Sequence, residues 1–199
     1  MKNVNVSQHI EHGCTHCTDC KSFSKLLSIQ IPTVVGREAP FKKLYAFIEK
    51  QCEPYKDLIE IISIKDNKTI SIGQKRQRLY EMANGLYSWQ IDDDDWIADN
   101  AIDLIMGVIR EGNDCITFME QCLFNGKPNG KSNFSIQYKE WADNVGGFDH
   151  VRTPFHKSPI KTKLCLQAGV KDMRYGEDHQ FSKDILPLLN TESHIDEII

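Results

Sequence analysis

The residues with the clearest chemical potential are four consecutive aspartates at positions 92–95, in the stretch SWQIDDDDWIAD. In an extended chain, alternate side chains share a face about 6.6 Å apart, so Asp92 and Asp94 would lie opposite Asp93 and Asp95. Two carboxylates at that distance repel by about 0.6 kcal/mol in water, and by several times more where the dielectric constant is lower. A divalent cation would relieve this repulsion. Mg²⁺ and Mn²⁺ prefer oxygen ligands, often one or two carboxylates together with substrate phosphates.

A solvated turn is the alternative interpretation of the four aspartates. In that case the later carboxylates would favour the N-terminus of the following helix through its dipole. The large apolar residues Ile91 and Trp96 flank the run and indicate that both of its ends are held against the core. A solvated turn needs no such residues, so the flanks favour the cation site.

Two further segments carry groups that could take part in a reaction. Glu177 and Asp178 form an acidic pair that could supply a general base. The same pair could simply stabilise the start of a helix, by about 0.3–1 kcal/mol. The basic stretch HVRTPFHKSPIKTK could neutralise a leaving group, and it contains His156, a candidate ligand of a substrate or metal. A packing or capping histidine is the alternative for His156.

The N-terminal stretch HIEHGCTHCTDC contains Cys14, Cys17 and Cys20 with histidines among them. Three thiolates and one imidazole could bind a structural Zn²⁺ tetrahedrally. Structural zinc sites normally join two separated ligand pairs, and no second pair is evident in the sequence. Incidental metal affinity of this segment is therefore the alternative.

Apolar runs and helical spacing alternate along the chain. Apolar or β-branched runs predict strands at 26–35, 57–66, 86–91, 114–120 and 133–141. Helical spacing predicts helices at 39–51, 73–83, 98–113 and 159–169, the last capped by Ser158, and a final one from Glu177 toward Pro187. In the second helix, Leu79, Met82 and Ala83 should face inward. This alternation predicts an α/β sheet, whose ligands bind at the carboxyl ends of the strands, where the aspartates lie.

Size and composition limit the possible functions. A chain of 199 residues with 40% hydrophobic content can bury one substantial core, so we expect one domain at residues 26–199 after an extension at residues 1–25. A net charge of −4 makes nucleic acid and anionic membranes poor partners for the whole molecule. No apolar run approaches the roughly 20 residues of a membrane span, and no signal peptide is evident. We therefore expect a cytoplasmic protein.

Four segments resemble landmarks of one enzyme family. ANGLYSWQIDDDDW resembles the stretch A-T-G-E-Y-I-x-F-L-D-D-D-D-W of family 2 glycosyltransferases. SIQIPTVVGRE is similar to the first strand of that family, IGQKRQRLYEM to its arginine-containing helix, and RYGEDHQFSKDI to its Gly-Glu-Asp segment. The landmarks occur in the family's order over residues 28–189. The resemblance implies a GT-A fold, with a Rossmann-like, mostly parallel central sheet and helices on both faces.

The resemblance also implies which residues bind the nucleotide-sugar donor. Asp92 would contact the ribose and sugar and could share the metal, and Asp94 would hold Mn²⁺ or Mg²⁺ on the diphosphate. Asp93 and Asp95 are ambiguous, because four aspartates permit a one-residue shift in register. The other positions implied as nucleotide-binding are Pro32, Thr33, Val35, Arg37, Asp66 and Arg76. His156, from the basic stretch, is a further candidate for binding the donor, on its residue type alone. Asp66 is a loose match, because the family's Asp-Gly-Ser turn is missing here.

The implied reaction is transfer of a sugar from a UDP- or GDP-sugar to an acceptor hydroxyl, with inversion. Asp178 would be the catalytic base, and Glu177 would help to orient the acceptor, which could be a glycan, protein, lipid or modified nucleobase. A nucleotidyltransferase is one alternative, although the sequence lacks a Gly-rich, basic loop after the first strand. A non-catalytic module that binds nucleotide sugars is another.

Overall fold

The computed structural model describes residues 23–199. The zinc site predicted at Cys14, Cys17 and Cys20 lies outside these residues. The division into an extension and a domain that begins at residue 26 stays a prediction.

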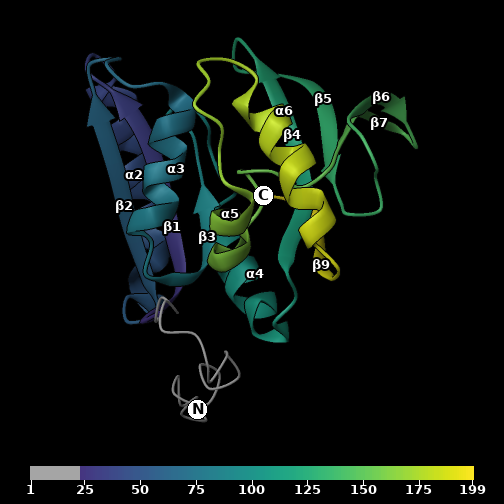
Figure 1. Cartoon of the computed structure of the whole chain (residues 1–199), viewed down its shortest axis with the longest axis horizontal. Coiled ribbons are helices and arrows are strands. Elements are labelled where there is room, and N and C mark those ends of the chain that lie inside the picture. Colours follow the sequence, from purple (N-terminus) through teal and green to yellow (C-terminus); the bar gives the residue numbers. More distant parts are fainter. Residues whose placement is uncertain (1–22) are drawn as a thin grey trace.

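The N-terminal half of the sheet consists of three parallel strands (Figure 1). They are β1 (Lys25–Val34), β2 (Ile59–Asp66) and β3 (Gly85–Gln90), in the order β2-β1-β3. Helix α2 (Glu38–Cys52) connects β1 to β2, and helix α3 (Ile72–Met82) connects β2 to β3. All three strands therefore end at the same edge of the sheet, as the sequence predicted.

The second half of the sheet is mixed in direction. The short strand β8 lies antiparallel between β3 and β4, β4 continues to β5, and β9 runs parallel to β4. The hairpin of β6 and β7 extends the sheet beyond β5 (Figure 1). The bounds are β4 (Cys115–Phe124), β5 (Lys127–Phe134), β6 (Ala142–Val145), β7 (Phe148–Arg152), β8 (Ile160–Lys161) and β9 (Glu192–Ile198).

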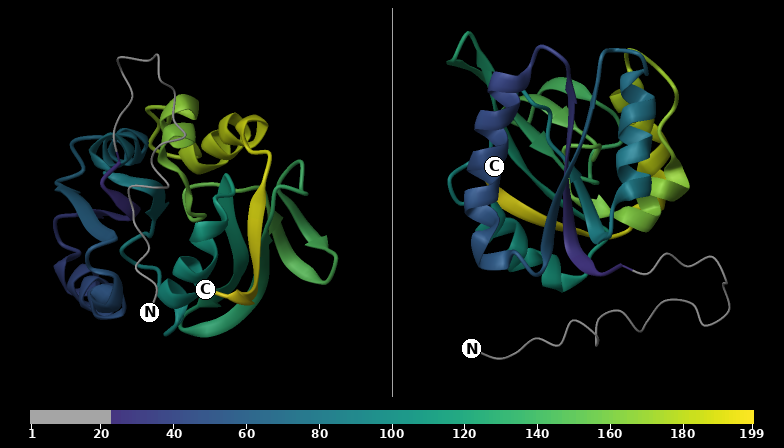
Figure 2. Two further views of the ribbon diagram at one scale, coloured as in Figure 1. Left: turned by 90° about the horizontal axis from the view of Figure 1, so that it is seen from below. Right: turned by 90° about the vertical axis from the view of Figure 1, so that its left-hand side faces the viewer.

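Helices cover both faces of the sheet (Figure 2). Helix α2 packs with α4 on one face, and α3 packs with α5 and α6 on the other. These helices are α4 (Ala101–Val108), α5 (Thr162–Ala168) and α6 (Glu177–Ile185). Short 3₁₀ turns follow three of the helices, at Glu53–Tyr55, Ile109–Glu111 and Leu186–Leu188. Within residues 23–199, none of the helices combines the length and the apolar character that crossing a membrane would require.

Three local predictions are wrong. The strand predicted at 133–141 ends at Phe134, and the chain then turns, with the amide of Tyr138 donating to the Ser135 carbonyl. Ser158 does not cap a helix, because Ile160 pairs with both β3 and β4 and the helix begins only at Thr162. Met82 was expected to face inward and is instead exposed, since it lies in the last turn of α3.

Candidate functional site

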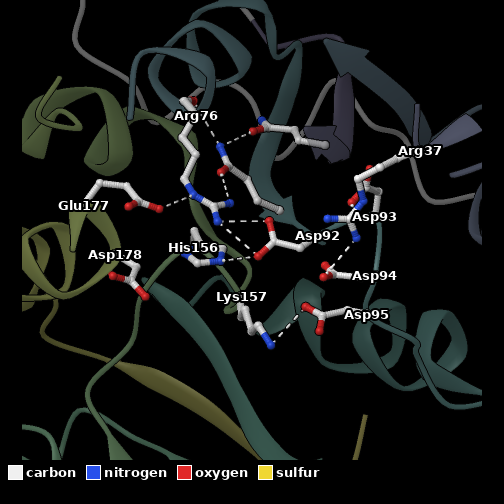
Figure 3. Close-up of polar contacts among 12 residues, drawn as sticks. Arg37, Arg76, Asp92, Asp93, Asp94, Asp95, His156, Lys157, Glu177 and Asp178 are labelled. Atoms are coloured by element: carbon white, nitrogen blue, oxygen red, sulfur yellow. Dashed lines mark hydrogen bonds and ion pairs between the residues drawn. The ribbon is translucent and has the colours of Figure 1, made fainter. Parts of the chain in front are cut away.

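The four aspartates follow β3 at the carboxyl edge of the sheet, as predicted, but they form a turn. The amide of Asp95 donates to the Asp92 carbonyl at 2.9 Å. The expected alternation of the carboxylates over two faces is therefore wrong, and they point toward different partners (Figure 3). Ile91 is buried, but Trp96 is exposed and stacks on Phe47, so only the first end of the run is pinned in the core.

Arg76 connects this acidic turn to the start of α6 (Figure 3). Its guanidinium is buried, with Nη2 2.9 Å from an Asp92 oxygen and Nε 3.2 Å from a Glu177 oxygen. Burial lowers the pKa of Arg76, but the two carboxylates outweigh it and raise the pKa above its usual value. Burial likewise raises the pKa of Asp92, but the Arg76 guanidinium outweighs it and brings the pKa well below its usual range. The Arg76–Asp92 pair is therefore fully ionised near neutral pH.

A buried polar ladder on the sheet holds Arg76 in place. Gln90 Nε2 donates to Gln30 Oε1 at 2.8 Å and to the Arg76 carbonyl at 3.1 Å. Gln90 Oε1 accepts from Arg76 Nη1 at 3.2 Å. Ser71 is the N-cap residue of helix α3, and its hydroxyl accepts a hydrogen bond from the amide of Gln74. The first turn of α3 is thus fixed over the ends of β1 and β3.

His156 lies against Asp92 on the side of the turn that faces α6. Its side chain is 3% exposed, and Nε2 is 3.5 Å from an Asp92 oxygen. Among the described residues, neither ring nitrogen has a hydrogen-bond partner. Burial, aided by Arg76, lowers the pKa of His156 to about 4, so the ring is neutral near pH 7. A buried polar group left unpaired costs about 1–3 kcal/mol, which favours a ligand at this ring.

Asp93 and Asp94 share one arginine on the other side of the turn. Arg37 Nη2 is 3.0 Å from an Asp93 oxygen and 2.9 Å from an Asp94 oxygen. Asp93 is buried and also accepts from the Thr33 hydroxyl at 2.5 Å. Asp94 is 63% exposed. The hydrogen bond to Asp94 raises the pKa of Arg37 above its usual value.

Lys75 is a site residue that the sequence interpretation missed. Its buried ammonium forms an ion pair with Asp66 and donates to the Thr33 carbonyl at 2.7 Å. Burial raises the pKa of Asp66, but Lys75 and the amide of Ile70 outweigh it and leave the value at about 2. The Asp66 carboxylate is therefore satisfied internally. Lys75 precedes Leu79 by four residues, and this spacing places it on the inward face of the predicted helix.

A second ion cluster fixes the end of the acidic turn. Lys157 Nζ is 3.0 Å from an Asp95 oxygen and 2.5 Å from a Glu120 oxygen on β4. Burial lowers the pKa of Lys157, but the two acids raise it well above its usual value. The Lys157 carbonyl also accepts from the indole of Trp89 at 2.7 Å. Lys157, which the sequence placed in a basic loop, therefore ties the turn to the second half of the sheet.

The acidic pair of α6 divides into two environments. Glu177 is buried on Arg76, whereas Asp178 is half-buried and accepts a hydrogen bond from the amide of His179. Figure 3 shows Glu177 and Asp178 on one side of Asp92, with Arg37 on the other. The Arg76–Glu177 ion pair therefore fixes the position of Glu177 and Asp178 relative to the acidic turn.

A pocket of about 220 Å³ lies over the turn and the end of β1. The residues that line it are Pro32, Thr33, Val34, Arg37, Ile72, Lys75, Arg76, Asp92, Asp93 and Asp94. Most of the predicted nucleotide-binding positions are thus brought together. Val35 is exposed beside the pocket, where Val34 takes the lining position instead. Asp66 and His156 lie behind the lining residues Lys75 and Asp92, and Glu177 lies behind Arg76.

The donor atoms around this pocket fit a cation only in part. Within residues 23–199, no three histidine, cysteine or acidic side chains are placed to hold a metal ion. Mg²⁺ and Mn²⁺ need only one or two carboxylates when substrate phosphates and water complete the shell. The exposed Asp94 fits that requirement, whereas Asp92 is already paired with Arg76 and a cage made by the protein alone is not formed by the described residues.

No protein-family model matches the sequence, and no curated protein matches it. Solved structures do match the fold. S. aureus TarS 1-349 is 17% identical with a TM-score of 0.60, over 86% of this chain and 58% of that structure. The complex of S. aureus TarS 1-349 with UDP-GlcNAc is 15% identical with a TM-score of 0.59, over 86% of this chain and 56% of that structure. The complex of S. aureus TarS 1-349 with UDP is 16% identical with a TM-score of 0.60, over 86% of this chain and 58% of that structure.

The chain therefore spans less than two thirds of the length of these TarS structures. At this identity the similarity shows the fold alone. The described residues form an α/β fold of the GT-A type, a mostly parallel mixed sheet covered by helices, as the sequence predicted.

Proposed function

We propose that this chain is a metal-dependent glycosyltransferase of the family 2 type, which moves a sugar from a UDP- or GDP-sugar to an acceptor hydroxyl with inversion. One observation carries the proposal: buried Arg76 joins the acidic turn at the pocket to the acidic pair that begins α6. Donor-binding and base-supplying groups are thereby held in one rigid unit. The TarS complexes with UDP and UDP-GlcNAc support UDP as the nucleotide.

The pocket would suit a nucleoside diphosphate once a divalent metal ion is bound, because its lining carries three basic and three acidic side chains. Arg37, Lys75 and Arg76 bring positive charge to its wall, and the aspartates of the turn lie on the same wall. Asp94 would hold Mn²⁺ or Mg²⁺, while Asp92 stays paired with Arg76. A metal ion at this position supplies charge stabilisation to the departing diphosphate. Pro32, Thr33 and Val34 supply the surface for the nucleoside.

Asp178 would accept the proton from the acceptor hydroxyl, whose oxygen then attacks the anomeric carbon as the nucleoside diphosphate leaves. Its carboxylate is half-buried and is not part of the Arg76 ion pairs. Glu177 is committed to Arg76, so its role in this proposal is to fix the start of α6, and it does not itself touch the acceptor. The acceptor hydroxyl would belong to a glycan, protein, lipid or modified nucleobase.

The test is release of UDP or GDP from the corresponding sugar nucleotides in the presence of Mn²⁺. The variants Asp94→Asn and Asp178→Asn should each lose about 10²-fold or more in turnover, the range expected for metal-ligand and general-base groups. Asp99→Asn is the matched control, because Asp99 is an exposed acid on the same loop. It should retain wild-type turnover.

The outcomes separate the alternatives. A pure binding module would be stabilised thermally by UDP or GDP but would release no nucleotide from any donor. A nucleotidyltransferase would instead release pyrophosphate from a nucleoside triphosphate and a sugar phosphate. Turnover that persists in both Asp94→Asn and Asp178→Asn would contradict the proposed mechanism.

A further inference from the structure

We propose that the carboxyl edge of the sheet is a docking face for a membrane surface that contains anionic lipids. The docking face is made by the turn after β1, the β4–β5 turn, the β6–β7 turn and the segment before α6. The inference goes beyond the proposed function and does not rest on it, because docking needs neither a sugar nucleotide nor a metal ion. Its consequence is that the pocket at this edge faces the lipid surface.

Exposed apolar side chains are concentrated on the docking face. Within residues 23–199, the large apolar side chains exposed there are Val35, Leu123, Phe124, Val145, Met173 and Tyr175. The other exposed ones, Met82, Trp96 and Ile198, lie in the last turn of α3, against α2 and on β9. Single exposed apolar residues are normal on a protein surface, but their collection at one edge indicates an interaction site.

The topology brings these four segments to the same edge. β3 and β4 both pair antiparallel with β8, so β4 runs in the direction of β3 and ends at the carboxyl edge. β7 runs parallel to β5, so the β6–β7 turn lies at the same end as the β4–β5 turn. The segment before α6 lies at the start of α3, where the amide of Gly73 donates to the Met173 carbonyl at 3.1 Å. Figure 1 shows the β4–β5 turn and this segment both at the top of the molecule.

The β4–β5 turn is the first apolar anchor of the docking face. Asn125 and Gly126 both have positive φ angles and form a two-residue turn, which closes the hairpin tightly. Directly before the turn, Leu123 is 59% exposed and Phe124 is 67% exposed. Transfer of these side chains from water into the interfacial region of a bilayer is favourable. The hairpin therefore presents two apolar side chains at a fixed tip.

The segment before α6 is the second anchor. Tyr175 is 88% exposed, and Met173 beside it is also exposed. The backbone of this segment is held in place, because Met173 is bonded to α3 and the Arg174 guanidinium donates to the Lys68 carbonyl at 3.5 Å. Tyrosine is enriched at membrane–water interfaces, where its ring is buried and its hydroxyl stays wet. This anchor therefore has the composition of an interfacial contact.

Basic side chains accompany both anchors, although the whole chain has a net charge of −4. Lys127 and Lys131 are exposed on β5, and residues 121–131 contain no acid. Lys171 and Arg174 are exposed in the segment before α6. Basic residues close to a bilayer are each attracted to anionic lipids, whereas charges at the far end of the molecule are screened by salt. The charge near the two anchors thus favours an anionic surface.

The separation of the anchors favours a bilayer over a folded protein as the partner. The right-hand view of Figure 2 shows the β4–β5 turn and the segment before α6 at one end of the molecule, on either side of the end of β1. The lining of the pocket at the end of β1 includes acids and bases. A protein partner requires one contiguous complementary patch. A lipid surface accepts separate apolar tips and leaves polar groups between them in contact with headgroups and water.

The experiment measures flotation of the full chain with vesicles, without sugar nucleotide or metal ion. The wild type should bind vesicles of equal parts phosphatidylcholine and phosphatidylglycerol, and should bind pure phosphatidylcholine about 10-fold or more weakly. Leu123→Ser/Phe124→Ser should lose about 10-fold or more in binding to the anionic vesicles, because less apolar area enters the lipid. Lys127→Gln/Lys131→Gln should lose about 5-fold for each charge removed.

Matched controls remove the same kinds of side chain away from the docking face. Met82→Ser removes an exposed apolar side chain from the last turn of α3. Lys50→Gln/Lys56→Gln removes two exposed lysines at and after the end of α2. Both controls should bind the anionic vesicles as the wild type does. Thermal unfolding of every variant should stay close to that of the wild type, since all the changes are at exposed positions.

The outcomes separate this inference from the proposed function. Absence of wild-type binding to the anionic vesicles overturns the docking face, and so does an equal loss in the variants and their controls. Self-association of the wild type that Leu123→Ser/Phe124→Ser abolishes, without vesicle binding, assigns the face to a second copy and also overturns the inference. None of these results affects the proposed function, because nucleotide release is measured without vesicles. Vesicle binding with no turnover on any donor would support the docking face and contradict only the proposed function.

Discussion

Asp92, Asp94 and Asp95 are neighbours in sequence, but their surroundings give them different chemical states. Burial raises the pKa of Asp92, but Arg76 outweighs it, so Asp92 is ionised near neutral pH. Burial raises the pKa of Asp95, even though Lys157 opposes this shift. Asp94 is open to solvent. The three carboxylates are therefore suited to different tasks: Asp92 to structure, Asp95 to anchoring and Asp94 to ligand exchange.

The buried imidazole of His156 predicts a pH dependence of stability. Its folded pKa of about 4 lies below the unfolded value near 6.5, so the unfolded chain binds a proton that the folded chain does not. This contribution is fully present above pH 6.5 and falls as the pH drops toward 4. In urea unfolding, the wild type should lose about 2 kcal/mol of stability from this histidine between pH 7 and pH 4.5.

The variant His156→Gln should show a shallower decline, since glutamine does not titrate. The control is His194→Gln, an exposed histidine on β9 outside the pocket, which should keep the wild-type slope. A slope that is the same for wild type and His156→Gln would show that His156 does not stay neutral in the folded protein.

Among the elements, the segment before α6 is held against α3 by hydrogen bonds. The amide of Gly73 donates to the Met173 carbonyl at 3.1 Å. Asp172 accepts from the Ser71 hydroxyl at 2.6 Å and from Gln74 at 2.7 Å. These contacts and the Arg76–Glu177 ion pair are made by one helix. The position of the proposed base therefore depends on α3 as much as on α6.

Gly73→Ala tests this dependence. A Cβ at position 73 would lie 1.9 Å from the Lys171 carbonyl oxygen, so the segment before α6 must move. We expect a loss of about 1–3 kcal/mol in unfolding free energy, typical of overpacking, and a loss of turnover.

Gly107→Ala in α4 is the matched control, because a Cβ there would meet nothing within 4 Å. It should stabilise the protein by up to about 1 kcal/mol, since alanine favours the helix over glycine. Equal effects of the two substitutions on stability and turnover would contradict the close fit of α3 to the segment before α6.

At the scale of the molecule, a narrow backbone link and a continuous core join the two halves of the sheet. The strand β8 bridges β3 and β4 through the pairs of Ile160 with Ser88 and Cys115. Aromatic contacts run across the join from Trp89 to Phe118 and on to Phe134. The hairpin of β6 and β7 lies beyond this core; β6 is mostly exposed and β7 is mostly of intermediate burial. Figure 1 shows it projecting from the end of the sheet.

Native-state hydrogen exchange should report this arrangement. Amides of β1 and β3 should exchange only through global unfolding, because both strands are buried and paired on two sides. Amides of β6 and β7 should exchange by local opening, with a free energy several kcal/mol lower. The edge strand β2 provides an internal comparison of intermediate burial. Protection of β6 and β7 equal to that of β1 would contradict this prediction.

The alternating strands and helices of the first half and the position of the acidic turn could be predicted from the amino-acid sequence. Apolar runs and helical spacing report local burial, and strand ends at a shared edge follow from parallel topology. Lys75 could have been found in the same way, because it lies on the inward face of α3. The pairing of β9 with β4 could not be predicted in this way, because β9 has few apolar residues among its polar ones.

The contacts of the individual aspartates could not be predicted, because they depend on how the folded chain brings distant segments together. Their partners are Arg37, Thr33 and Arg76 from the first half of the chain, and His156 and Lys157 from the second. Arg76 and Glu177 are 101 residues apart, a separation that no periodicity records. Ion pairs of this kind form where the folded sheet brings distant segments together. For this reason four residues that look equivalent in sequence became a turn with separate roles.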